Sequence, residues 1–102
     1  MKFFNYLLIL LFFGFQTLNA EEILNLGKKI FLEKGNCAMC HALSDAGSHA
    51  DIGPNLNLIK PNVKTVIMAV TNGIGVMPAY DGILTTSEIK AVAKYVAEKS
   101  NQ

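Results

Sequence analysis

Three segments of the chain carry apolar residues at helical spacing. They cover residues 21–34, 63–71 and 85–99. Within each segment, the apolar positions lie three and four residues apart, so that they share one helix face. These positions are Ile23, Gly27, Ile30 and Phe31; Val63, Val66, Ile67 and Val70; and Ile89, Val92, Ala93 and Val96. The pattern predicts three amphipathic helices.

Residues typical of helix ends flank these segments. Thr85-Thr86-Ser87-Glu88 is a capping box before the last helix, with Leu84 and Ile89 spaced for a hydrophobic staple. Asn62 is a candidate N-cap for the middle helix. Gly35 follows the first helix as a stop signal, and Lys34 is expected in its last turn.

The remaining segments read as loops. Residues 44–57 are rich in Ser, Asp, Gly, Asn and Pro, and residues 73–82 contain Met77-Pro78. Residues 36–43 are expected to form a short helical turn. The β-branched residues of 63–71 would also suit a strand, but no partner strand is evident. The pattern as a whole therefore predicts an all-α domain.

The first twenty residues read as a secretory signal peptide. Lys2 gives a positive start, residues 6–15 are apolar or small, and Leu18-Asn19-Ala20 offers a small residue before the cut. The alternative is an uncleaved membrane anchor, but the apolar stretch from Phe3 to Leu18 is shorter than the roughly 20 residues that a spanning helix needs. We expect export to the periplasm, cleavage, and no stable membrane insertion afterwards.

Cleavage after residue 20 of 102 would leave one domain of 82 residues, 21–102. So small a domain has little core and needs a staple. The whole chain has a net charge of +1, and no basic stripe with interleaved aromatic residues suggests a nucleic-acid partner. Charge alone thus predicts neither nucleic-acid binding nor strong electrostatic steering.

Cys37-Ala38-Met39-Cys40-His41 is a C-x-x-C-H motif, the signature of a covalently attached c-type haem. In a helical turn, residues three and four apart share a face, so that Cys37 and Cys40 can bind two vinyl groups while His41 is aimed at the iron. One covalent haem c would also supply the missing staple. C-x-x-C occurs in thioredoxin-like and zinc sites too, but no βαβ pattern or second ligand pair is evident.

Met77 is the candidate for the second axial ligand. It lies in Gly73-Ile74-Gly75-Val76-Met77-Pro78, where glycines allow a close approach and Pro78 fixes the direction of the chain. The alternative is a loop methionine packed on the haem edge.

The other candidate ligands are less suitable. Met39 is expected to point outward from the motif, and Met68 to fill the core from mid-helix. His49 lies only eight residues after His41 in a polar loop, and is expected to be solvated.

In their order along the chain, these motifs resemble the small class I bacterial cytochromes c of the monohaem, His/Met type. The resemblance spans nearly all of residues 21–102. It rests on Gly27-x-x-x-Phe31, Cys37-x-x-Cys40-His41, Gly53-Pro54-x-Leu56, Asn72-Gly73, Met77-Pro78-x-Tyr80 and Tyr95.

The resemblance implies a class I cytochrome c fold, with three to four short helices around one covalently bound haem. In that fold the first and last helices cross, with Gly27 near Tyr95. The carbonyl of Pro54 would bind the Nδ1 proton of His41 and fix its tautomer. The residues expected to wrap the porphyrin are Phe31, Leu56, Tyr80 and Val96.

These observations predict a periplasmic carrier of single electrons between a donor and an acceptor protein, and not an enzyme. We expect partners to dock near Ala38 and Met39, with Val76 and Ala79 extending an apolar rim. The protein would be a monomer or part of a small complex. The alternatives are a haem subunit of a periplasmic oxidoreductase, such as a sulfite or other sulfur-compound dehydrogenase, a haem-based ligand-binding or sensing protein, and a thiol oxidoreductase.

Overall fold

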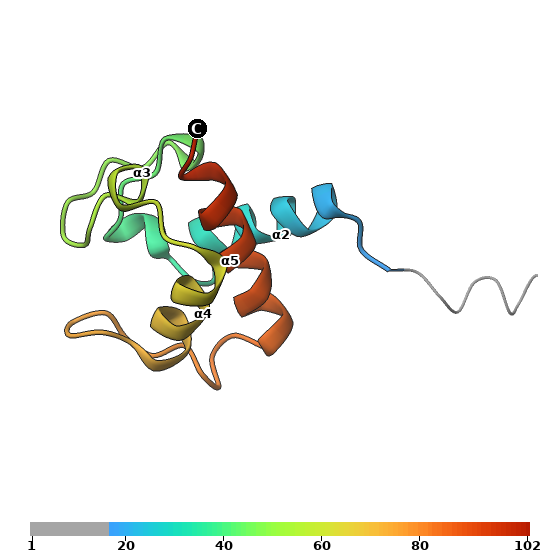
Figure 1. Cartoon of the computed structure of the whole chain (residues 1–102). Helices are drawn as coiled ribbons and strands as arrows, with labels where there is room; N and C mark the ends of the chain where they lie inside the picture. The colour runs from blue at the N-terminus through green and yellow to red at the C-terminus, as the bar shows by residue number, and fades with distance from the viewer. Residues whose placement is uncertain (1–16) are drawn as a thin grey trace, which may run out of the picture.

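The computed structural model describes residues 17–102, a range in which helices are joined by loops (Figure 1). Its α-helices are α2 (Ala20–Leu32), α3 (Leu56–Ile59), α4 (Val63–Asn72) and α5 (Thr86–Lys99), with 3₁₀ turns at Cys37–Met39 and Ser44–Ala46. Residues 17–102 contain isolated bridges but no named strand. The all-α prediction with three to four short helices is therefore confirmed. The first sixteen residues of the predicted leader lie outside this range.

The helix ends largely follow the expected capping residues. The Thr85 hydroxyl accepts a bond from the Glu88 amide at 3.1 Å, and the Glu88 carboxylate accepts one from the Thr85 amide at 2.9 Å. Asn62 caps α4 through the amide of Thr65. The first helix ends earlier than predicted, at Leu32, and Lys34 is not in its last turn but forms an ion pair of 2.8 Å with Glu88.

Helix α3 was not predicted. Its first two residues were assigned to the loop of residues 44–57. This helix has a single turn with one buried residue, Leu56. The Asn55 side chain caps it at 2.9 Å from the Asn57 amide, and Lys60, at φ +45°, ends it. One turn is too short to show a helical period, so only the turn residues were visible in the sequence.

Met68 lies on the outer face of α4 and is 56% exposed. The expectation that it fills the core is wrong. Val66 and Val70, four residues apart, form the buried face of this helix. A residue midway between them points to the opposite side, because each step along an α-helix turns by about 100°.

Helices α2 and α5 cross in close contact at Gly27, as predicted. A Cβ atom at this position would lie 2.3 Å from the carbonyl oxygen of Ala91 and 2.5 Å from Cβ of Tyr95. Next to the crossing, the rings of Phe31 and Tyr95 pack with centroids 5.8 Å apart. Of the two explanations left open by the sequence, tolerance of glycine or a close crossing, the structure supports the second.

We expect Gly27→Ala to destabilise the protein by about 3 kcal/mol or more, because its methyl group would push two packed backbones apart. Urea unfolding of the haem-loaded protein measures the loss. Asn25→Ala is the matched control, since it adds no contact to the crossing and lies on the exposed side of the same helix. Equal stability of the Gly27→Ala and Asn25→Ala proteins would contradict the close crossing.

A polar network fastens the loop after the motif to both long helices. The Tyr95 hydroxyl donates to Asp45 at 2.7 Å, and Lys28 of α2 lies 3.4 Å from the same carboxylate oxygen. The Tyr95 hydrogen bond, more than the Lys28 charge, lowers the pKa of Asp45. In turn, burial and the Asp45 carboxylate raise the pKa of Tyr95.

This network predicts a loss of stability in acid. Because the pKa of Asp45 is lower in the folded than in the unfolded protein, its contribution is present above about pH 4, the unfolded value, and is lost as pH falls through the folded value. Asp45→Asn should therefore weaken the fall in urea midpoint between pH 7 and pH 3. Asp51→Asn, in an exposed loop, is the control. The same pH dependence in both variants would refute the contribution of Asp45.

Candidate haem site

A cavity of about 310 Å³ lies between the motif segment, α4, α5 and the loop after α4. Its lining holds no Asp, Glu, Lys or Arg. All nine predicted site residues line it: Phe31, Cys37, Cys40, His41, Pro54, Leu56, Met77, Tyr80 and Val96. The structure thus brings together residues that are up to 65 residues apart in the sequence, from Phe31 to Val96.

The C-x-x-C-H motif is a tight turn at one edge of this cavity. The amides of Cys40 and His41 both bond to the Cys37 carbonyl, at 3.1 and 3.0 Å. Asn36 enters the turn at φ +50°, in the left-handed region that asparagine tolerates. Met39 is 62% exposed and points away from the cavity, as expected. Both thiols therefore lie on the cavity side of one short turn.

Two of the alternative functions of the motif fit this geometry poorly. Burial raises the pKa of the Cys37 thiol to about 11, whereas reactive redox cysteines have a lowered pKa. Among residues 17–102, no group of three or more His, Cys, Asp or Glu side chains could hold a metal ion. A thiol oxidoreductase and a structural zinc site thus both lack what their chemistry needs.

The imidazole of His41 is held from behind by the segment 52–54. Its Nδ1 atom lies 2.7 Å from the carbonyl oxygen of Pro54, which can only accept, so Nδ1 carries the proton and donates. A Cβ atom at Gly53 would lie 2.6 Å from Cε1 of the ring. The Gly53 amide bonds in turn to the Cys40 carbonyl at 2.7 Å. This leaves Nε2 of His41 unprotonated and available to a metal.

Met77 enters the lining from a two-residue turn. Ile74 and Met77 exchange backbone hydrogen bonds of 3.2 and 2.9 Å, and Gly75 stands at φ +55° at the first position of the turn, where a type II′ turn uses glycine. Gly73 has φ +73°, and a Cβ there would lie 2.6 Å from the Met77 carbonyl oxygen. His49, the rival ligand, is exposed and does not line the cavity.

The wall of the cavity is continuous with the hydrophobic core. Phe31 is fully buried, and Leu56 and Val96 are 7% and 3% exposed. Tyr80 is half-buried, and burial raises the pKa of its hydroxyl. That hydroxyl donates to the Gly35 carbonyl oxygen at 2.5 Å.

Several lining residues were not assigned to the site from the sequence. Some belong to the predicted stripes of α4 and α5, namely Val66, Val70 and Val92, and their periodicity marked them as core without showing what they face. Others lie on or beside the unpredicted helix α3 or in the loops: Asn36, Ile52, Ile59, Pro61, Ile74 and Val76. For all of them except Asn36, an apolar residue outside the predicted helices was the available signal.

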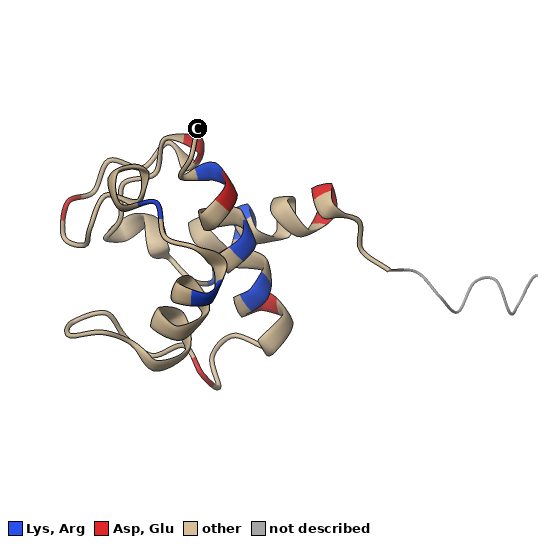
Figure 2. Cartoon of the chain, in the orientation of Figure 1, with Lys and Arg blue, Asp and Glu red and all other residues tan. Residues whose placement is uncertain are grey.

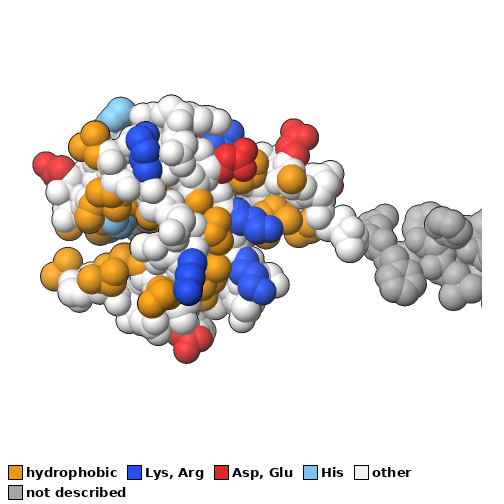
Figure 3. Space-filling model, viewed as in Figure 1, with side chains coloured by type: hydrophobic (Ala, Val, Ile, Leu, Met, Phe, Trp, Pro, Cys, Tyr) orange, Lys and Arg blue, Asp and Glu red, His pale blue; other side chains and the backbone are white. Residues whose placement is uncertain are grey.

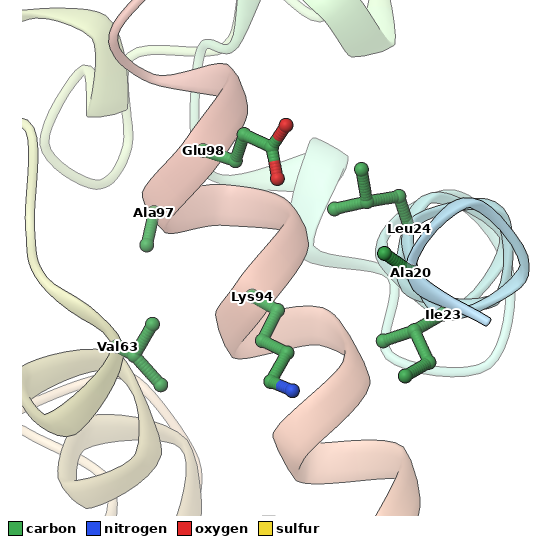
Figure 4. Close-up of a pocket in the computed structure, with 7 residues that line it drawn as sticks. All are labelled: Ala20, Ile23, Leu24, Val63, Lys94, Ala97 and Glu98. Atoms are coloured by element: carbon green, nitrogen blue, oxygen red, sulfur yellow. The ribbon is translucent and has the colours of Figure 1, made fainter. Parts of the chain in front are cut away.

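A second hollow, of about 450 Å³, lies where α2 and the start of α4 flank α5 (Figure 4). Ile23 and Leu24 of α2 form one side and Val63 the other, while Lys94 and Glu98 project from α5 between them. It contains no cysteine, histidine or methionine. The chemistry therefore belongs to the cavity beside the C-x-x-C-H motif.

The residues present fit a haem c. Two sulfur atoms lie on one turn, an imidazole offers a free Nε2, and an uncharged apolar wall surrounds them. The sequence model of the family described as cytochrome c oxidase, cbb3-type, subunit III matches residues 20–96. A cytochrome c6 of Chlorolobion braunii is 37% identical, over 78% of this chain and 94% of that protein. The chain belongs to the c-type cytochrome family.

Two further proteins are similar to this cytochrome. The crystal structure of the c-type cytochrome SorU from Sinorhizobium meliloti is similar with a TM-score of 0.76 and 50% identity, over 80% of this chain and 95% of that one. The cbb3-type cytochrome c oxidase subunit FixP of Bradyrhizobium is 43% identical over 69% of this chain but only 25% of its own length. The protein is thus a monohaem electron carrier with one covalently bound haem c, and its fold is that of the class I cytochromes.

Among residues 17–102 of the cytochrome, none of the helices is both long and apolar enough to cross a membrane.

Proposed function

We propose that this cytochrome is an exported carrier of single electrons whose haem is tethered by Cys37 and Cys40 and whose iron is held by His41 and Met77. One observation supports the proposal above all: His41 donates from Nδ1 to Pro54, so that its free Nε2 faces a cavity that Met77 also lines. The two candidate ligands come from different segments, His41 from before α3 and Met77 from after α4.

The haem supplies a one-electron redox couple between ferrous and ferric iron. The protein adjusts that couple in three ways. The Pro54 carbonyl raises the basicity of His41, the thioether of Met77 favours ferrous iron, and the apolar wall keeps water away from the charge. If His41 and Met77 both held the iron, no open site for a small substrate would remain, which supports a role as carrier and not as enzyme.

A near-infrared spectrum tests the ligation directly. The oxidised protein should show a sulfur-to-iron charge-transfer band, and the reduced protein should bind carbon monoxide slowly. Rapid carbon monoxide binding without the band would instead support the alternative of a ligand-binding or sensing protein.

The surface around the cavity suits docking by apolar contact. Hydrophobic side chains gather on both sides of the hollow in Figure 3. The exposed apolar residues that line the cavity form what we call the cavity rim: Ile52, Ile59, Ile74 and Val76. Residues 35–44, 52–59 and 65–80 include no Asp, Glu, Lys or Arg, and most charges of Figure 2 lie on the helices behind them. Electrons would pass through this rim to and from partner proteins.

We therefore expect electron transfer to the physiological partner to depend little on salt. Between about 10 and 200 mM ionic strength, the second-order rate constant should change less than about threefold, since no rim side chain carries a charge and the nearby exposed charges of Asp51 and Lys60 are of opposite sign. Stopped-flow mixing measures it. Val76→Asp, which places a charge on a side chain that is 93% exposed in the rim, should slow transfer and introduce salt dependence. A steep salt dependence of the unmodified protein would contradict apolar docking.

A second candidate is a haem subunit of a periplasmic oxidoreductase, for example one that oxidises sulfite or another sulfur compound. The family description, which names an oxidase subunit, and the match to FixP favour it. Purification from the native host separates the two functions. A stable complex with a larger subunit would support the subunit role, whereas a solitary monomer would support the free carrier.

A further inference from the structure

The Met77 loop, residues 73–79, is fastened mainly to itself and to the helix that precedes it. Its own turn joins Ile74 to Met77, the Gly73 amide bonds to Ala69 of α4 at 2.8 Å, and the Tyr80 amide bonds to Val70 of α4 at 2.8 Å. These bonds fix the shape of the loop. They do not fix its distance from the motif on the other side of the cavity.

One hydrogen bond spans that distance. The Tyr80 hydroxyl donates to the Gly35 carbonyl at 2.5 Å, across 45 residues of sequence. Among the hydrogen bonds of residues 17–102, it is the one that joins residues 73–80 to the segment just before Cys37. It therefore ties the Met77 side of the cavity to the side that carries the two cysteines.

The acceptor is rigidly held. Gly35 is buried, and its amide bonds to the Ile30 carbonyl at 2.8 Å, which closes the end of α2. A Cβ at Gly35 would lie 2.9 Å from that carbonyl oxygen and 3.1 Å from Sγ of Cys37. Since the backbone here is packed against both the helix end and the tether, its carbonyl can serve as a fixed point for the loop.

We propose that the Tyr80 hydroxyl is a positioning group that holds the Met77 loop closed over the haem, and that it sets how fast Met77 leaves the iron. The inference rests on the proposed ligation by His41 and Met77. Tyr80 touches the cavity wall, but the hydroxyl acts through the loop. Without the bond, the loop opens more often, and each opening also loosens its turn and its attachment to α4.

Tyr95, the other tyrosine among residues 17–102, provides a matched control. Tyr95→Phe removes the same hydroxyl from a residue that bonds to Asp45 and does not line the cavity. Both variants lose one hydrogen bond, so both should unfold at a lower temperature. Only the Tyr80 variant should change the access of an external ligand to the iron.

The experiment measures imidazole binding to the oxidised, haem-loaded protein by stopped flow, at imidazole concentrations where the rate no longer rises. That limiting rate reports the opening of the Met77 loop. We expect Tyr80→Phe to raise it about three- to tenfold, the effect of one lost neutral hydrogen bond, and Tyr95→Phe to leave it unchanged. A limiting rate in Tyr80→Phe equal to that of the unmodified protein overturns the proposal, as does an equal increase in both variants.

Hydrogen exchange gives a second measurement that does not depend on ligation. The hydrogen-bonded amides of Gly73, Ile74 and Met77 should exchange faster in Tyr80→Phe than in Tyr95→Phe, and equal exchange overturns the proposal. If the unmodified protein lacks the sulfur-to-iron band, the proposed ligation of the iron by Met77 is wrong. The hydrogen-exchange rates still test whether the Tyr80 hydroxyl holds the Met77 loop closed. If the Tyr80→Phe protein failed to acquire haem, the role of the Tyr80 hydroxyl would not be confined to the Met77 loop, and the proposal would be overturned.

Discussion

Replacing both Cys37 and Cys40 by alanine is expected to yield a secreted chain that has no covalent haem and little cooperative structure. The cavity of about 310 Å³ is lined by core residues, so without haem it must collapse or fill with water. At roughly 24 cal/mol per Å³, an unfilled cavity of this size costs about 7 kcal/mol. That is comparable to the whole stability of a domain of this length, about 4–12 kcal/mol.

Intact mass and far-ultraviolet circular dichroism measure the two parts of this prediction. The mass should equal that of the bare polypeptide, and the helical signal should fall well below that of the unmodified protein. Met39→Ala is the control, because it lies inside the same motif with an exposed side chain, and should keep both the haem and the helical signal. A colourless double variant with native helix content would show that the fold does not depend on the haem.

Met77→Ala is expected to remove the near-infrared band of the oxidised protein and to lower its reduction potential by on the order of 100 mV or more. Loss of the soft thioether removes the ligand that favours ferrous iron. It also opens a space beside Tyr80 into which water or an added ligand can enter. Potentiometric titration and absorption spectroscopy measure both effects.

Met68→Ala is the matched control for this substitution. It makes the same chemical change nine residues earlier, in the preceding helix, where the side chain is 56% exposed and does not line the cavity. The band and the potential should stay within error of the unmodified protein. Retention of the band in Met77→Ala would mean that another residue supplies the sixth ligand.

The sequence was most informative where structure repeats over several turns or where chemistry needs a fixed spacing. The three longer helices showed a helical period, and the capping box at Thr85 and Glu88 marked the start of the last. The approach of Gly27 to Tyr95 followed from family resemblance, and a glycine inside an apolar stripe was its only local sign. The C-x-x-C-H motif named the cofactor because two tethers and one ligand must lie within five residues.

The sequence was least informative where tertiary contacts decide. Helix α3 owes its single turn to a local cap by Asn55 and to the burial of Leu56, and that burial depends on neighbours distant in sequence. Met68 was assigned to the core because of its residue type, although its position relative to Val66 and Val70 placed it on the outer face. The hydrogen bond from Tyr80 to Gly35 joins two loops, and no local sequence pattern predicts such a pair.

The first turn of α2 has a consequence for the order of maturation. Asn19 caps it, since its side chain accepts from the Glu22 amide at 2.8 Å and its carbonyl from Ile23 at 3.0 Å. A peptidase that cuts after Ala20, as proposed, would remove both acceptors and leave a new ammonium group at the positive end of the helix dipole, beside Glu21 and Glu22. Since such an enzyme needs an extended substrate, we expect trimming to precede both helix formation and haem capture. Secreted chains that have not yet acquired the cofactor should then already begin at Glu21 by N-terminal sequencing.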